Sequence, residues 1–125
     1  MNKEKEVRIN NVLSKQYYRD PVVKAYTLKR ANGKCDLCEQ DAPFITKSGE
    51  PYLESHHVKH LEDNGLDSIS NTVALCPNCH KKVHFGKKES SDYKKMINVI
   101  IKYIINDINL SDQEKEFYLV ELEKR

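Results

Sequence analysis

The sequence has no tryptophan and little glycine or proline. Among its 125 residues there are only four glycines and four prolines. Collagen-like and low-complexity chains need far more of both, so these classes are excluded. A chain of this length corresponds to one domain. We therefore predict a single globular domain over residues 1–125.

The sequence also lacks a long apolar run. Its most apolar stretch, residues 96–108, is too short to span a bilayer and contains polar and charged residues. The first six residues, Met-Asn-Lys-Glu-Lys-Glu, have none of the apolar character of a secretory signal. A mean hydropathy of -0.74 fits a polar globule with a modest core. We expect a cytoplasmic location and no membrane partner. Reducing conditions there favour metal binding by cysteine over disulfides.

Cysteine is present, and its spacing is regular. The four cysteines form two Cys-x-x-Cys pairs separated by a long insert. Two such knuckles can bring four sulfurs to the tetrahedral positions around one zinc, which is then fully coordinated. The predicted structural Zn²⁺ ligands are Cys35, Cys38, Cys76 and Cys79.

The histidines are more numerous than a zinc site closed by four cysteines needs. His80 and His84 are four residues apart, so on a helix they face the same side and can hold one ion. A preceding strand could add His56. Three imidazoles leave coordination positions open, as in catalytic metal sites. His57 then remains unligated and could take a proton from water at neutral pH. Strict strand alternation would separate His56 from His57, so the scheme requires a twisted strand end.

The net charge of +2 is unevenly distributed. Basic residues gather between residues 15 and 34 and again around His84, whereas the segment from residue 89 onward is slightly acidic. This layout favours a phosphate-bearing partner, although a solvated charged surface is the simpler interpretation. His60 is interpreted as a solvated loop residue. The candidate nucleic-acid contacts are Lys81, Lys82, Lys87 and Lys88.

The hydrophobic pattern predicts an α+β chain in three parts. Residues 1–32 are expected to form a helical N-terminal extension, with helix over residues 5–32 broken near Asp20-Pro21 and stopping at Ala31-Asn32-Gly33. Residues 33–86 hold the zinc knuckles and the core. Residues 87–125 form the C-terminal helices.

Within the central part, strands are predicted over residues 52–58 and 72–75, joined by a loop. A helix carrying the last two histidines follows the second cysteine pair and ends at Gly86.

The C-terminal part is predicted to hold two helices. The first, over residues 92–109, is rich in isoleucine, and its apolar arc is wider than one neighbour needs, so a homodimer through this part is a second interpretation. The other is opened by the capping-box pattern Ser111-Asp-Gln-Glu114.

These residues resemble the motif of the HNH endonucleases. The resemblance covers residues 35–85, and its fuller pattern is similar to the HNH domains of McrA-type modification-dependent restriction endonucleases. It implies a small ββα-metal core with the four-cysteine structural zinc site, flanked by the N-terminal and C-terminal helices. The motif reads Glu54-x-His56-His57, then Asp67 and Asn71, then Cys76-x-x-Cys79-His80-x-x-x-His84.

The resemblance also implies roles for the site residues. His57 matches the general base, and Asn71 matches a residue that braces the loop and helps to orient that base. Glu54 matches an acidic residue whose role is either catalytic or a structural hydrogen bond. The motif's usual Gly-Gly-x-Asp is here Asn64-Gly65-Leu66-Asp67. The matching ligands of a single divalent ion (Mg²⁺, Mn²⁺, Ni²⁺ or Zn²⁺) are His56, His80 and His84.

The function implied by the resemblance is hydrolysis of DNA phosphodiester bonds, in restriction or phage defence. Products would carry 5′-phosphate and 3′-hydroxyl ends. The alternative is a non-catalytic zinc-knuckle module that binds nucleic acid, which would have no need of His57 and Asn71. A colicin-like toxin nuclease would share the chemistry but would need a delivery region. The DNA recognised, and whether one strand or both are cut, are left open.

Overall fold

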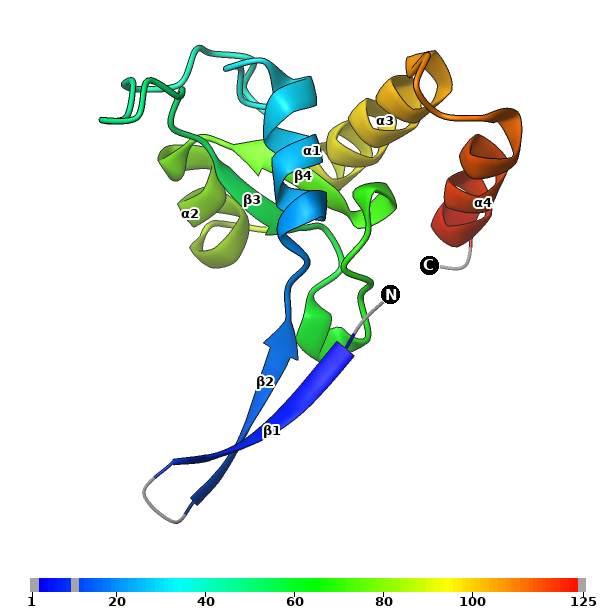
Figure 1. Cartoon of the computed structure of the whole chain (residues 1–125). Helices are drawn as coiled ribbons and strands as arrows, with labels where there is room; N and C mark the ends of the chain where they lie inside the picture. Colours follow the sequence, from blue (N-terminus) through cyan, green and yellow to red (C-terminus); the bar gives the residue numbers. More distant parts are fainter. Residues whose placement is uncertain (1–2, 10–11, 124–125) are drawn as a thin grey trace.

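The computed structural model describes the backbone of residues 3–9 and 12–18 and the whole of residues 19–123. A two-stranded hairpin extends from a body in which helices surround a second two-stranded sheet (Figure 1). In chain order the elements are β1 (Lys3–Ile9), β2 (Val12–Tyr18), α1 (Pro21–Ala31), β3 (Glu54–His57), β4 (Thr72–Leu75), α2 (Pro77–Phe85), α3 (Ser90–Asn106) and α4 (Asp112–Glu123). Two short 3₁₀ turns, Leu61–Asp63 and Ile69–Asn71, precede β4.

The N-terminal extension is not helical throughout: the prediction was wrong for residues 5–9 and 12–18, and its part on residues 10–11 lies outside the described residues. β1 and β2 pair antiparallel, from Lys3 opposite Tyr18 to Ile9 opposite Val12. The segment is rich in β-branched and aromatic residues, which favour strands. Cross-strand pairing therefore prevails over the weak helical pattern.

Helix α1 begins and ends where the sequence predicts. The Asp20 carboxylate accepts a hydrogen bond from the backbone N–H of Val22 at 2.9 Å, and Pro21 occupies the first helical position. At the other end Asn32 and Gly33 have φ of 52° and 81°, so the chain leaves the helix through the left-handed region. These local signals place the start of α1 directly after the hairpin.

The core lies around β4. β3 and β4 pair antiparallel, with His56 opposite Val73 and His57 opposite Thr72. Three consecutive residues of β4, 73–75, are fully buried, because α1 and α3 both contact this strand (Figure 1). From α3, Ile100 and Ile104 are 1% exposed, which confirms that the isoleucine-rich helix supplies core.

A buried ion pair joins the first cysteine knuckle to this core. Arg30 of α1 contacts Asp36 at 3.0 Å and donates to the backbone carbonyl of Thr72 at 3.2 Å. The other oxygen of Asp36 accepts from the N–H of Ala74 at 2.7 Å. Both charged side chains are nearly inaccessible, so loss of either would leave an unpaired buried charge. The knuckle is thereby fixed against β4.

The C-terminal helices follow the prediction with shifted bounds. α3 runs from residue 90 to 106 rather than 92 to 109. Asp107 leaves the helical conformation, and its carboxylate accepts a hydrogen bond from Tyr26 at 2.7 Å. The capping box of α4 is confirmed in both directions: Ser111 N–H donates to Glu114 at 2.9 Å, and Glu114 N–H donates to the Ser111 hydroxyl at 3.1 Å. Within the described residues no helix is long and apolar enough to cross a membrane.

Candidate metal centres and catalytic site

The four cysteines converge as their spacing predicts. Their sulfurs all lie within 4.8 Å of one another, and the Sγ atoms of Cys38 and Cys76 are 3.9 Å apart. A tetrahedral zinc with bonds of about 2.3 Å places its sulfurs about 3.8 Å apart, so the cluster fits this ion. In each knuckle a backbone N–H points at the first sulfur, from Leu37 to Cys35 and from Cys79 to Cys76, both at 3.4 Å. Cys35 and Cys79 are buried.

The three histidines predicted as ligands form a second cluster. His80 and His84 lie one turn apart on α2, and β3 places His56 beside them. One nitrogen from each lies within 4.8 Å of the others, and the Nε2 atoms of His80 and His84 are 3.2 Å apart. Four-coordinate ions with bonds of about 2.0–2.1 Å separate their nitrogens by about 3.3 Å, so these side chains fit a divalent ion.

Glu54 orients one of these imidazoles. Its Oε1 lies 2.8 Å from Nδ1 of His80, which therefore carries a proton and leaves Nε2 for a metal. Its Oε2 accepts a hydrogen bond from the Tyr52 hydroxyl at 2.7 Å. The hydrogen bonds from Tyr52 and His80 hold the pKa of Glu54 below its usual value, so the carboxylate stays charged. This geometry corresponds to the structural alternative for Glu54.

The surroundings of His56 and His84 favour their neutral forms. Burial, followed by the neighbouring charges of His80 and His84, lowers the pKa of His56 to about 3. The pKa of His84 is lowered for the same reasons, burial first and His80 second. Neutral imidazoles present lone pairs, so the cluster is suited to metal binding at neutral pH.

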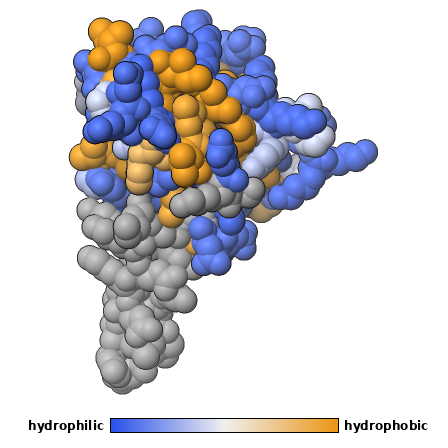
Figure 2. All heavy atoms as spheres, turned by 90° about the vertical axis from the view of Figure 1, so that its right-hand side faces the viewer, coloured by the Kyte–Doolittle hydropathy of each residue, from blue (hydrophilic) through white to orange (hydrophobic). Residues whose placement is uncertain are grey.

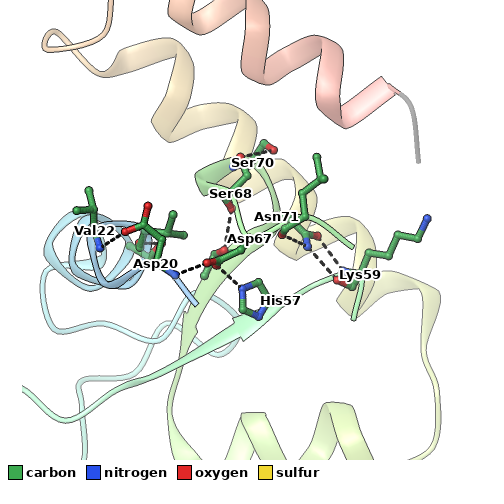
Figure 3. Close-up of polar contacts among 12 residues, drawn as sticks. Asp20, Val22, His57, Lys59, Asp67, Ser68, Ser70 and Asn71 are labelled. Atoms are coloured by element: carbon green, nitrogen blue, oxygen red, sulfur yellow. Dashed lines mark hydrogen bonds and ion pairs between the residues drawn. The ribbon is translucent and has the colours of Figure 1, made fainter. Parts of the chain in front are cut away.

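The ring of His57 points toward Asp67 (Figure 3). Its Nε2 is 2.8 Å from Oδ1 of Asp67, a carboxylate in a buried residue. The second oxygen of Asp67 accepts a hydrogen bond from the backbone N–H of Asp20, just before α1. The carboxylate thus fixes the ring of His57 and ties it to the start of α1. Because β3 ends at His57, both His56 and His57 still border one cavity despite the strand alternation.

Asn71 braces the loop between β3 and β4. Its amide donates to the carbonyls of Lys59 and Leu66 at 2.9 and 2.7 Å, and its Oδ1 accepts from the N–H of Lys59 at 2.9 Å (Figure 3). Gly65 lets this loop close tightly, since a Cβ there would lie 1.9 Å from the Lys59 carbonyl oxygen. Of the two roles assigned to Asn71, loop bracing matches these contacts. The side chain that bonds to the ring of His57 is Asp67.

The C-terminal helix contacts the same loop. The hydroxyls of Ser68 and Ser70 both donate to Oε1 of Glu121 at 2.8 Å. Ser68 and Ser70 are buried next to Asp67 (Figure 3). α4 therefore supports the segment that carries the partner of His57.

The histidines line a cavity of about 460 Å³. Five residues without an assigned role also line it, and the charged or titratable ones are Arg19, which is exposed, His60 and Glu62. The prediction that His60 is merely solvated was wrong. Its side chain is only 33% exposed, and its ring lies 5.6 Å from that of His56 and 5.2 Å from that of His84. An arginine in a cavity lined by histidines that can hold a metal ion is suited to contact phosphate.

The four candidate lysines are exposed but not equivalent. Lys81 lies beside the histidines, on a second cavity that also contains His80 and His84. Lys82 is paired with Asp92 at 3.2 Å. Lys87 and Lys88 border a smaller hollow near His56 and His60. Lys81 is thus the lysine of this set on the wider cavity beside the metal ligands.

Comparison with known proteins agrees with this geometry. Residues 35–86 match the HNH endonuclease sequence family. The "Type IV methyl-directed restriction enzyme EcoKMcrA" of Escherichia coli (strain K12) is 51% identical over 75 residues, which are 60% of this chain and 27% of that protein. A solved structure of the "Type IV phosphorothioation-dependent restriction endonuclease ScoMcrA" superposes with a TM-score of 0.59 and 32% identity, over 67% of this chain and 16% of that one.

Residues 35–86 are therefore similar to the HNH endonuclease family, and the small sheet with the following helix agrees with the ββα-metal fold that the motif implies. The relatives that the chain resembles are restriction enzymes of the McrA type. It spans 27% of the length of the first and 16% of the second, so similarity is confined to a small part of each.

Sequence reasoning missed the contributions of Asp67, Arg19 and His60. A signal for Asp67 existed, since it occupies the acidic position of the loop motif. Arg19 precedes Asp20-Pro21, which is the start of α1 and not a break between two helices. No pattern in the sequence distinguishes His60 from an ordinary loop histidine.

Proposed function

We propose that the protein is a metal-dependent DNA endonuclease that hydrolyses phosphodiester bonds. The observation that carries the proposal is one cavity bordered by three convergent imidazoles and by His57, whose ring is hydrogen-bonded to Asp67. A zinc-binding module without catalysis has no need for a second, open cluster beside an oriented histidine. The match of residues 35–86 to the HNH endonuclease family supports the same conclusion.

In the proposed mechanism His57 is the general base. Asp67 accepts a hydrogen bond from the Nε2–H group of His57. The lone pair of Nδ1 then remains for a water molecule in the cavity. A divalent ion held by His56, His80 and His84 would supply Lewis-acid stabilisation of charge on the phosphate. Arg19 would bind a neighbouring phosphate oxygen. Attack in line would give 5′-phosphate and 3′-hydroxyl products.

The test is plasmid nicking with Mg²⁺, Mn²⁺, Ni²⁺ or no divalent ion. We expect cleavage that requires an added ion, and His57→Ala should reduce the rate by about 10²- to 10⁴-fold, the usual contribution of general base catalysis. Circular dichroism and DNA binding should be unchanged in this variant. A well-folded His57→Ala protein with normal nicking would remove the base assignment. An absence of nicking under every metal would favour the zinc-knuckle binding module.

The biological role we propose is restriction of modified DNA. It is supported by the similarity to two enzymes whose names describe a methyl-directed and a phosphorothioation-dependent activity. Cleavage of methylated, phosphorothioated and unmodified plasmids in parallel tests it. Equal cleavage of all three would indicate a nonspecific nuclease. The cytoplasmic location stays a prediction.

We also propose a homodimer through the C-terminal helices. Hydrophobic side chains gather on the face that carries α3 and α4 (Figure 2), where Ile105, Phe117 and Val120 are 50%, 60% and 41% exposed. Two copies would supply the two centres that a double-strand break requires. Sedimentation equilibrium at micromolar concentration should give the mass of a dimer, and a clean monomer would reject the proposal.

A further inference from the structure

A second cavity adjoins the catalytic one on the side of α2. Its volume is about 640 Å³, and it shares Ser55, His80 and His84 with the cavity described above. The two hollows are therefore adjacent, and the candidate metal ligands His80 and His84 line both of them. A DNA strand whose scissile phosphate lies at the histidines must extend past them in both directions, and the second cavity offers space on the side of α2.

Two aromatic side chains line the second cavity. Phe85, the last residue of α2, lines it and is 80% exposed, and Tyr52 lines it as well. Tyr52 is held in place, since its ring stacks on Phe44 at 4.7 Å and its hydroxyl donates to Glu54. Single exposed apolar side chains are common, but this one stands one residue from a metal ligand in the wall of a cavity. The position gives Phe85 a face that a planar ligand can cover.

The same wall is positively charged. Lys81 places its ammonium 5.5 Å from the centre of the Phe85 ring, and Lys24 of α1 also lines the cavity. Glu54 is the one acidic side chain among the lining residues, and both its oxygens are engaged, by Tyr52 and by His80. Cations beside an aromatic face are the combination that proteins use to hold a nucleic-acid strand, the cations on phosphates and the ring on a base.

We propose that this second cavity binds the nucleotide next to the scissile phosphate, with its base stacked on Phe85 and its phosphate beside Lys81 and Lys24. The proposal rests on the endonuclease function proposed above and deepens it. The alternative, in which DNA contacts the histidine cavity and only the outer lysines, would leave Phe85 in water.

The missing tryptophan provides a clean test. The chain contains none, so Phe85→Trp introduces a single indole whose emission reports on stacking. The experiment uses the full chain without a divalent ion in the histidine site, and titrates it with mixed-sequence single-stranded DNA, whose bases are free to stack, while labelled DNA reports saturation by anisotropy. Phe117→Trp is the matched control, because Phe117 is an exposed phenylalanine on α4 at 60% exposure.

We expect emission of Phe85→Trp to be quenched at saturating DNA and that of Phe117→Trp to be unchanged. Phe85→Ala should bind about tenfold more weakly, the usual size of one lost stacking contact, whereas Phe85→Trp should retain affinity. Unchanged emission of Phe85→Trp at saturation, equal quenching of both indoles, or full affinity in Phe85→Ala would each overturn the proposal. Quenching in a protein that nicks no plasmid would support this binding site and reject the nuclease function. Nicking without quenching would do the reverse.

Discussion

The two candidate metal sites differ in how completely the protein encloses them. The cysteine cluster has four ligands, two of them buried, and backbone N–H groups point at its sulfurs. The histidine cluster has three ligands, with His56 buried and His84 exposed to a cavity. A complete ligand set gives rigidity, and an incomplete one leaves room for a substrate. The comparison separates a site that holds the fold from a site that acts on something outside it.

The largest expected effect comes from breaking the closed cluster. Cys76→Ser should unfold much of the domain, because zinc binding contributes folding free energy on the order of 10 kcal/mol in structural sites. His84→Ala, on the same helix but outside this cluster, should keep the fold. Circular dichroism and zinc content by atomic absorption measure both. If Cys76→Ser kept its secondary structure and melting temperature, the cysteine cluster would not have the structural role.

The next largest effect is expected at Asp67, which holds the proposed general base His57 beside the histidine cluster. Asp67→Asn keeps an oxygen that can accept from the N–H of Asp20 but weakens the orientation of His57, so we expect kcat to fall about 10- to 100-fold. The pH dependence of kcat should also change, since the charge beside the imidazole is lost. Ser70→Ala, which removes one bond to Glu121 from the same loop, is the control. An unaltered pH profile together with full activity would contradict the role of Asp67.

A smaller effect is expected at the carboxylate behind His80. Glu54→Gln cannot accept from both Tyr52 and His80 with the same strength, so metal affinity should fall about 10- to 100-fold, as for other lost partners of a ligating histidine. Isothermal titration with Mn²⁺ or Ni²⁺ measures this. Stability in the absence of added metal should change little. Unaltered affinity would mean that Glu54 does not hold the ring.

The smallest effect distinguishes two neighbouring lysines. Lys81 lines the second cavity, whereas Lys82 is paired with Asp92. Lys81→Ala should therefore weaken DNA binding and reduce the slope of log K against log salt concentration by about 0.9. Lys82→Ala should change neither the affinity nor the slope. Fluorescence anisotropy between about 50 and 200 mM salt, the range over which phosphate contacts are lost, gives both slopes. The same slope for both variants would remove the distinction.

The sequence was informative where chemistry depends on residue type and spacing. The cysteine pairs, His80 and His84, the capping box and the start of α1 are local patterns, and the structure agrees with each. His56 lies beside α2 because β3 pairs with β4. The motif implied this pairing, but the local sequence pattern of either strand could not predict it.

Other features depend on contacts between distant segments. Asp67 accepts from Asp20, 47 residues away, and Glu121 meets Ser68 across 53 residues. Such bonds leave no periodic trace in a sequence. The N-terminal error has a different origin, because residues 5–18 mix strand-forming side chains with charges at spacings that also suit a helix, and cross-strand pairing decides between them.

One nine-residue helix carries ligands of both clusters, with Cys79 and His80 adjacent in its first turn. An ion in either cluster therefore restrains the same turn that the other ion needs. The coupling is reciprocal. If zinc in the cysteine cluster raises the affinity of the histidines for their ion by some factor, that ion raises the affinity of the cysteines for zinc by the same factor. Loss of zinc from the cysteine cluster would therefore also weaken the binding of an ion by the histidines.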